Sequence, residues 1–301
     1  MSDVVAGQQG MLDRLYRTHV AAGSRYALLD FPDHANVGDS AIWLGETAML
    51  RRITGRDPCY TSCWHDFDDA AFRAACPDGV VFLHGGGNLG DIWPHHQRFR
   101  DGIVAALRDY PVVQLPQSIH FDEPAASHRF AEHAARHPDF TLYVRDRPSL
   151  DIAKAWVGER ARLAPDSAFA LGAQRRPAAA GVPLLALMRS DGERRPHADA
   201  VPAHATIVDW LADDEAPPPG RDAAARQRQA GARLQRGLRL LARGERVVTD
   251  RLHGHILSLL LGIPHAVLDN RYGKVGAYID AWTGGSPLLE RRPDAAPALP
   301  R

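Results

Sequence analysis

Cysteine is scarce in this sequence, and long apolar runs are missing. The three cysteines, Cys59, Cys63 and Cys76, form an odd set, so we expect reduced thiols rather than a disulfide framework, as in a cytoplasmic protein. Cys59 and Cys63 have the spacing of half a metal site, but no second pair follows, which favours ordinary half-buried thiols.

No membrane segment is expected either. The longest apolar run, Ile256 to Ile263, is far too short to cross a bilayer. The first residues lack the basic and then apolar pattern of a signal peptide. The sequence therefore predicts a cytoplasmic location.

Excess charge of either sign is also absent, since Lys+Arg and Asp+Glu both number 36. A neutral chain has no global field that would attract nucleic acid or an acidic membrane, so we expect no nucleic-acid partner. Any recognition of an anion must come from a local cluster. The length of 301 residues favours two domains.

Apolar runs without alternation recur along the chain, and helical patterns separate them. This arrangement predicts an α/β protein with parallel sheets covered on both faces. In the first half, we expect a strand in 25–30 and a helix from about Ser40. A strand from Gly79 should run into a triple-glycine turn, and a strand from Tyr110 should be ended by Pro116.

The composition changes in 172–183, which is small, basic and proline-containing and suits a linker. A second α/β set follows. We predict two Rossmann-like domains, 1–172 and 183–285, with a cleft between them, and a tail, 286–301, disordered beyond its first few residues. The stretch 213–222 is expected to be a mobile loop.

The unusual polar clusters follow predicted strands, where ligands of open parallel sheets bind. Asn36, Gly38 and Asp39 follow the first strand: Gly38 permits a tight turn, and Asp39 or Ser40 can cap the next helix. A plain loop with a cap is an equally good interpretation.

The glycine triplet follows the next strand. Its backbone N–H groups can approach a ligand closely, although the pattern is neither GxGxxG nor a Walker A sequence and can also be a simple turn. The residues are Gly85, Gly86 and Gly87, followed by Asn88.

Two arginines end further strands. Arg145 can clamp a carboxylate or phosphate with Asp146 orienting it, or the two can form a surface ion pair. Arg189 repeats this placement in the second half.

The densest cluster is "TDRLHGH", Thr249 to His255, between a β-branched run and an apolar helix. Helix N-terminal amides with Arg251 can hold an anion, and His253 can carry a proton near neutral pH. His253 and His255 also have the spacing of some metallohydrolase ligands, but the arginine would repel a dication, so no metal is expected.

Taken in order, these clusters resemble the polysaccharide pyruvyl transferase family. The matching segments are "NVGDSAIWLGE", "FLHGGGNLGD", "QLPQSIHF", "VRDRPS", "APDSAF", "VVTDRLHGHILSLLLGIPHAVLDN" and "YGKVGAYIDAW". They span Asn36 to Trp282, and the version here looks nearest to members acting in bacterial exopolysaccharide synthesis.

The resemblance implies a GT-B-like two-domain fold and transfer of pyruvate from phosphoenolpyruvate to a sugar as a cyclic ketal, with release of phosphate and no further cofactor. It places Arg251, Leu252 and His253 at the donor, with Arg145 as the best match for an arginine from the first domain. His253 would be the catalytic proton carrier, and Asp250 would orient His253 or Arg251. Further substrate-binding candidates are Arg189, Asn36, Asp39, Gly85, Gly86, Gly87, Asn88, His255 and Lys274.

Two other functions stay open at this level. One is a GT-B glycosyltransferase that uses a nucleotide sugar, and the other is a non-enzymatic, glycan-binding member of the family. The sequence does not identify the acceptor sugar. If the exopolysaccharide resemblance holds, the acceptor is a lipid-linked oligosaccharide, which would bring the protein to the inner face of the membrane as a peripheral partner.

Overall fold

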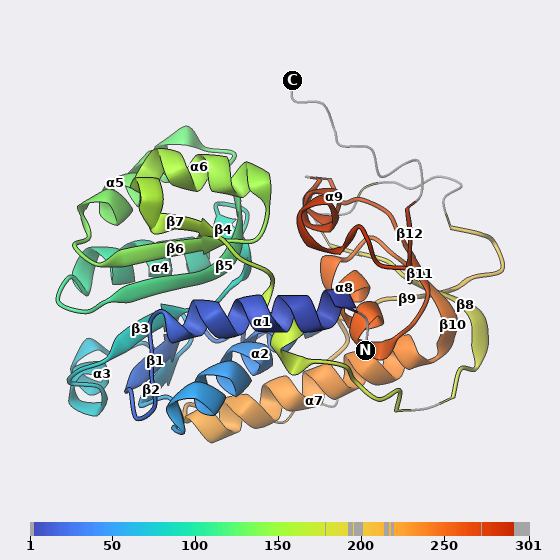
Figure 1. Cartoon of the computed structure of the whole chain (residues 1–301), viewed down its shortest axis with the longest axis horizontal. Coiled ribbons are helices and arrows are strands. Elements are labelled where there is room, and N and C mark those ends of the chain that lie inside the picture. The colour runs from blue at the N-terminus through green and yellow to red at the C-terminus, as the bar shows by residue number, and fades with distance from the viewer. Residues whose placement is uncertain are drawn as a thin grey trace.

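Two parallel β-sheets with helices packed around them form the computed structural model of the chain (Figure 1). The structure describes residues 3–177, 179–191, 195, 201–213, 217, 220–271 and 273–291. The α/β class and the parallel sheets predicted from the unalternating apolar runs are confirmed.

The first sheet is built from the first half of the chain. Its strands are β1 (Tyr26–Leu29), β2 (Tyr60–Ser62), β3 (Val80–Leu83), β4 (Gly86–Gly90), β5 (Val112–His120), β6 (Phe140–Val144) and β7 (Ala161–Leu163). The helices of this half are α1 (Asp3–Arg17), α2 (Val37–Thr54), α3 (Asp69–Ala75), α4 (Pro94–Ala106), α5 (Pro124–Arg136) and α6 (Arg147–Val157), followed by the short helical turns η1 (Gly158–Arg160) and η2 (Ser167–Leu171).

The second sheet is built from the second half. Its strands are β8 (Val182–Leu187), β9 (Thr206–Val208), β10 (Gly244–Thr249), β11 (His265–Val267) and β12 (Leu289–Arg291). Its helices are α7 (Ala223–Ala242), α8 (Leu252–Leu261) and α9 (Lys274–Tyr278), with the turn η3 (Ile279–Thr283) after α9.

Both sheets have the same doubly wound strand order. The first runs β2-β1-β3-β5-β6-β7, with β4 paired to β5, and the second runs β12-β11-β10-β8-β9. In each sheet the second strand lies outside the first, and the third lies on the first strand's other side. The direction in which successive strands are added to the sheet therefore reverses between β1 and β3 and between β8 and β10. Ligands of such sheets bind outside the carboxyl ends of the strands at that point.

One apolar core joins the two sheets. The largest cluster of buried side chains contains Leu28 and Phe82 of the first sheet together with Leu185 and Val247 of the second. Helix α7 lies along α2, as Figure 1 shows. Its buried Arg226 donates to the carbonyl of Thr61 and pairs with Asp66. The sheets are thus fixed against each other, while the predicted domain boundaries and the GT-B-like arrangement stay predictions.

Three local expectations were wrong. Pro116 does not end its strand, because β5 continues through a register shift between Gln114 and Gln117, and a bulge is where a strand tolerates proline. Gly86 and Gly87 begin β4 rather than forming only a turn. Helix α2 is capped by Asn36, which accepts from the amide of Gly38, and not by Asp39 or Ser40.

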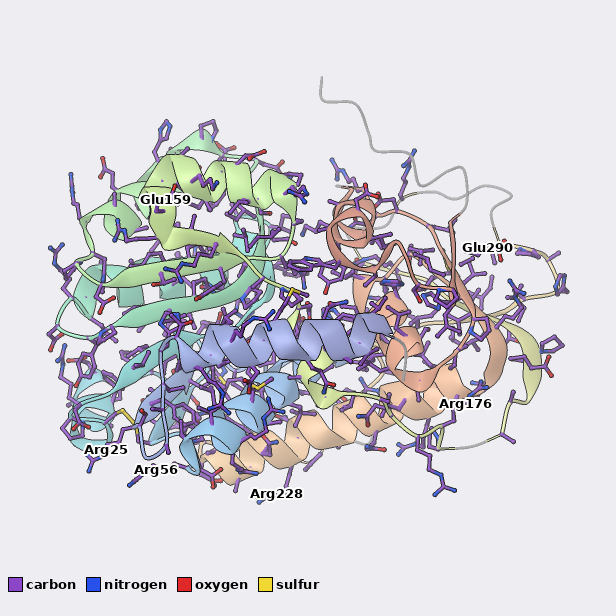
Figure 2. The ribbon with its side chains drawn as sticks, viewed as in Figure 1. Arg25, Arg56, Glu159, Arg176, Arg228 and Glu290 are labelled. Carbon is purple, nitrogen blue, oxygen red and sulfur yellow. A yellow bond between two sulfur atoms is a disulfide. The ribbon has the colours of Figure 1, made fainter. Side chains whose placement is uncertain are left out.

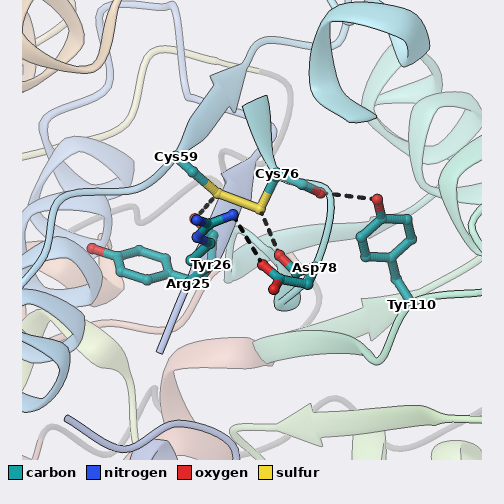
Figure 3. The surroundings of a disulfide bond; sticks show 6 residues. All are labelled: Arg25, Tyr26, Cys59, Cys76, Asp78 and Tyr110. Atoms are coloured by element: carbon teal, nitrogen blue, oxygen red, sulfur yellow. Dashed lines mark hydrogen bonds and ion pairs between the residues drawn. A yellow bond between two sulfur atoms is a disulfide. The ribbon is translucent and has the colours of Figure 1, made fainter. Parts of the chain in front are cut away.

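The expectation of reduced thiols was also wrong. Cys59 and Cys76 form a disulfide, with their Cα atoms 5.6 Å apart, and Figure 3 shows it beside the Arg25–Asp78 ion pair. Cys63 is buried and free. The spacing along the chain did not reveal this pair, because α3 separates the two cysteines in sequence and brings them together in space.

The remaining expectations concern the surface and the ends. Residues 286–291 are ordered through β12, which pairs with β11, whereas 292–301 and half of the predicted loop 213–222 lie outside the described residues. Among the described residues, no helix is both long and apolar enough to span a membrane. Figure 2 shows charged side chains of both signs, such as Arg56, Glu159 and Arg228, on separate parts of the surface, in keeping with the balanced charge.

Candidate functional site

A cavity of about 530 Å³ lies between the carboxyl ends of the two sheets. The segments that follow β1, β2, β4 and β6 line it from the first sheet, and those that follow β8, β9, β10 and β11 line it from the second. It therefore joins the points where the strand order of each sheet reverses. Ten of the residues proposed from the sequence line it: Asn36, Asp39, Gly87, Asn88, Arg145, Arg189, Arg251, Leu252, His253 and Lys274.

Arg145 is held rigidly at the first-sheet wall. Its Nε donates to Ser118 Oγ at 3.0 Å, and its terminal nitrogen pairs with Asp166 at 2.6 Å. The helix cap Asp146 does not contact the guanidinium directly, but accepts from the same Ser118 hydroxyl at 2.6 Å. Arg145 is 3% exposed, so this is not the surface ion pair that the sequence left open.

Arg251 and Arg189 enter from the second sheet. Arg251 pairs with Asp209 at 2.8 Å and with Asp191 at 3.4 Å, and it lies over the ring of Trp210. Arg189 pairs with Asp191 through two nitrogens, at 2.8 and 3.1 Å. A guanidinium held by carboxylates on one side presents its remaining N–H groups in fixed directions, which suits recognition of an anion.

Lys274 is the fourth cationic side chain that lines the cavity, after Arg145, Arg189 and Arg251. Its Nζ donates to the carbonyl oxygen of Gly87 at 3.1 Å, so a residue of the second half bonds directly to the glycine segment of the first. Four cationic side chains from both sheets therefore line one cavity, in a chain whose net charge is zero.

His253 lies in the first turn of α8, against the start of α2. A Cβ atom added at Gly38 would lie 2.8 Å from the Cβ of His253 and closer still to its ring. Gly38 is therefore needed for close approach rather than for the tight turn expected from the sequence, and its φ is not positive. The imidazole Nε2 is 3.3 Å from Asp166.

Asp166 is the site residue that sequence reasoning missed. Its fully buried carboxylate lies between Arg145 and His253 and also accepts from the amide of Ala168 at 2.9 Å. Burial alone would raise the pKa of Asp166, but the charges of His253 and Arg145 outweigh it and lower that pKa below its usual range. The signal was present in "APDSAF", which places an aspartate shortly after a short strand, but nothing local linked it to the two cations.

Asn36 and Asp39 form a second polar group on the first-sheet side. The Asn36 amide donates to Asp39 at 2.9 Å, and His34 Nε2 is 3.6 Å from the same carboxylate. Burial would raise the pKa of Asp39, yet the neighbouring charges of His34 and His253 lower it overall. An ionised Asp39 near His253 can orient a hydroxyl or balance a cation.

The glycine triplet has three different local roles. Gly85 does not line the cavity, and its amide donates to the buried Glu46 at 2.8 Å. Gly86 also lies off the cavity lining and has φ +125, a conformation that favours glycine. Gly87 does line it, and a Cβ there would meet the Arg145 guanidinium at 2.8 Å. The triplet thus makes room for Arg145 and the sheet backbone.

Asn88 lines the cavity, and hydrogen bonds from two buried side chains fix its position. Its side-chain oxygen accepts from Arg100 at 2.6 Å and from Gln117 at 2.8 Å. The same Arg100 pairs at 2.7 Å with Asp30, a buried residue with φ 70 at the carboxyl end of β1. Gln117 belongs to the "PQS" segment, and its side-chain amide also donates to the carbonyl of His84.

Besides Gly85 and Gly86, two further predicted residues do not line the cavity. His255 is fully buried and bonded to His265 at 2.7 Å and Thr283 at 2.8 Å, because it lies on the core face of α8. Asp250 is fully buried and accepts from the backbone amide of Arg189 at 2.8 Å. The carboxylate 3.3 Å from the His253 imidazole is that of Asp166, and the orienting role expected of Asp250 stays a prediction.

A cluster that includes Asp33 of the cavity lining has the composition of a metal site. Ligand atoms of Asp33, Cys63 and His65 lie within 4.8 Å of one another. Burial, however, raises the pKa of the Cys63 thiol to about 12, and the Arg233 guanidinium is 3.6 Å from Asp33. The adjacent guanidinium cation would repel a metal dication here.

Comparison with known proteins finds relatives over most of the chain. The profile of the polysaccharide pyruvyl transferase family matches residues 36–272, from the cap of α2 to the segment before α9. Pyruvyl transferase 1 of Schizosaccharomyces pombe is 31% identical over 93% of this chain and 75% of its own length. EpsO of Bacillus subtilis, to which pyruvyl transferase activity is assigned provisionally, is 30% identical over 86% of this chain and 85% of its own.

One solved structure has a similar fold. A Klebsiella pneumoniae protein of uncharacterised function superposes with a TM-score of 0.60 at 18% identity, covering 97% of this chain and 99% of that one. The fold, the convergence of the predicted residues on one cavity and the match over most of the sequence agree. The chain belongs to the polysaccharide pyruvyl transferase family.

Proposed function

We propose that this protein transfers pyruvate from phosphoenolpyruvate to a pair of hydroxyls on a sugar, forming a cyclic ketal and releasing phosphate. The observation that carries the proposal is the convergence of Arg145, Arg189, Arg251 and Lys274 with His253 on one cavity. Phosphoenolpyruvate bears a phosphate and a carboxylate, and a protein of zero net charge needs such a local cluster to hold it.

The phosphate and the carboxylate of the donor would bind to Arg145 from the first half of the chain and Arg251 from the second. Arg251 and the free amides at the start of α8 suit one group, since a helix N-terminus favours an anion. Arg145 and Lys274 approach from the opposite side and suit the other. This arrangement leaves C2 and C3 of the donor near the His253 imidazole.

His253 would donate the proton to C3 and take up the proton of the first hydroxyl. A protonated imidazole donates to C3, the methylene becomes a methyl group, and C2 becomes an oxocarbenium-like centre. A sugar hydroxyl bonds to C2 and gives up its proton to the imidazole. A second hydroxyl then replaces phosphate at C2: its oxygen bonds to C2, the bond between C2 and the phosphate oxygen breaks, and the hydroxyl proton leaves with phosphate. Asp166 stabilises the imidazolium form, and the arginines stabilise the leaving phosphate.

The wider setting is part of the same proposal. The two sheets would correspond to two Rossmann-like domains in a GT-B-like pair, joined through 172–183. The acceptor would be a sugar of an exopolysaccharide or of its lipid-linked precursor, processed at the inner face of the membrane by a cytoplasmic protein. No cofactor besides the donor is required by this chemistry.

Ligand-induced stabilisation tests the donor. A ligand present at a hundred times its Kd stabilises the folded state by about 2.7 kcal/mol, so phosphoenolpyruvate should raise the Tm. UDP should not, because the proposed site is shaped for a small dianion. Stabilisation by UDP alone would support the nucleotide-sugar alternative instead.

A transfer assay tests the reaction. With phosphoenolpyruvate and a panel of acceptor sugars, the product should gain the mass of pyruvate less one water, with one phosphate released per ketal. His253→Ala should abolish both signals while the protein stays folded, and His128→Ala, on an exposed position of α5, should leave them unchanged. Wild-type turnover in His253→Ala would remove this residue from the mechanism, and donor binding without phosphate release would favour the glycan-binding alternative.

A further inference from the structure

The cavity has a second end of different chemistry. Within the described part of the chain, four large apolar side chains are classed as exposed, and two of them, Trp64 at 40% and Trp93 at 43%, line this cavity. The other two, Ile152 and Ile207, do not. Indole rings left in water at the edge of a cavity mark a binding surface rather than a core defect.

Trp64 is held in a fixed orientation. It follows β2, and its ring stacks on His95 with centroids 4.6 Å apart and planes 18° apart. His65 meets it edge-on, with centroids 5.0 Å apart. Trp93 lies directly before α4, where it occupies the cap position of the helix. A ring fixed by two neighbours loses little entropy when a ligand covers its free surface.

Hydrogen-bonding groups line the space beside this aromatic end. His96, held by the buried Asp30 at 2.7 Å, faces His34 edge-on with centroids 6.0 Å apart. Asp33 and Asn36 line the same cavity. Apolar rings flanked by hydrogen-bond donors and acceptors are suited to a ligand that has one apolar face and many hydroxyls, which distinguishes this end from the cationic end that contains Arg145, Arg189, Arg251 and Lys274.

We propose that Trp64, Trp93 and His95 form the acceptor subsite, which binds a neutral hexopyranose residue by stacking against its C–H face. The ring hydroxyls then point toward His34, His96 and Asp33, and a hydroxyl pair at the far edge of the sugar reaches the cationic end. The subsite rests on the proposed function for its role in catalysis. Stacking works through burial of apolar C–H surface and through polarised C–H bonds against the negative face of the indole.

Steady-state kinetics separate this role from a structural one. Trp64→Ala and Trp93→Ala should each raise the acceptor KM by about tenfold, the size of an aromatic contact, and leave the stabilisation by phosphoenolpyruvate at its wild-type value. Trp64→Phe should restore much of the affinity, because a smaller ring still stacks. Ile152→Ala removes an equally exposed apolar side chain away from the cavity and should change nothing.

Binding without the donor tests the subsite independently of the reaction. Methyl glycosides of glucose, galactose and mannose are titrated into the protein while its tryptophan fluorescence is followed. A saturable change with at least one sugar, lost in the Trp64→Ala/Trp93→Ala double variant, supports the subsite even if phosphoenolpyruvate fails to bind. No saturable change in the wild type, or the same change in the double variant, overturns it.

Discussion

Replacing Gly38 by alanine tests the contact between α2 and α8 beside the cavity. The added Cβ would lie 2.8 Å from the Cβ of His253 and closer to its ring. Because the Cβ of His253 is itself involved, a rotation of the ring cannot remove the overlap, so α8 or α2 must shift. Forcing a methyl group into a packed position costs about 1–3 kcal/mol, against a gain of about 0.5–1 kcal/mol for alanine over glycine inside a helix.

The net loss of stability should be about 0–2.5 kcal/mol, and the displaced imidazole should lower turnover by about a hundredfold, as expected for a shift near 1 Å. Gly231→Ala is the matched control, since it also lies in a helix but an added Cβ meets nothing within 4 Å. It should stabilise the protein and keep its activity. Urea unfolding and initial rates measure both effects. If Gly38→Ala matches Gly231→Ala in stability and turnover, His253 does not occupy the position described.

Three further perturbations address the charges and the disulfide. Asp166→Asn should lower turnover by about a hundredfold or more, because it removes the negative charge 3.3 Å from His253. The pKa of Asp30 is lowered: burial raises it, but the Arg100 and His96 charges outweigh burial. The stability it contributes is therefore present above its unfolded pKa of about 3.9 and lost as the pH falls further, so the acid limb of an unfolding curve should be flatter in Asp30→Asn. Reducing the disulfide should cost about 3 kcal/mol at neutral pH, measured by urea unfolding with and without reductant.

Each of these has a clear opposing result. Wild-type turnover in Asp166→Asn would mean that His253 needs no buried counter-charge. An identical acid limb in Asp30→Asn would show that its carboxylate does not titrate differently on folding. A reductant that lowers the stability of Cys59→Ser/Cys76→Ser as much as that of the wild type would act elsewhere, since this variant has no disulfide to lose.

The sequence predicted the parts of the site that repeat a general rule. Polar residues after unalternating apolar runs lie at the carboxyl ends of parallel strands, and this rule placed Arg145, Arg189 and Arg251 correctly on one cavity. It could not show which face of α8 each histidine occupies. His253 and His255 are two residues apart, so on a helix they point in different directions, and only packing decided that the second lies in the core.

Contacts between distant segments were beyond the reach of the sequence. Asp166 becomes important only when β7 and α8 are brought together around Arg145, and the disulfide only when α3 folds back onto β2. The tryptophans Trp64 and Trp93 look like ordinary loop residues until the cavity beside them is known. In each case the chemistry depends on tertiary neighbours that no local pattern contains.

Calorimetric titration of phosphoenolpyruvate tests the central claim most directly. The account predicts saturable binding at a single site in the wild-type protein and a loss of affinity of at least about tenfold in Arg251→Gln, the size of a charge-assisted hydrogen bond. Arg228→Gln, on the exposed side of α7, should bind like the wild type. Absence of binding in the wild type, or equal affinity in Arg251→Gln, would contradict it.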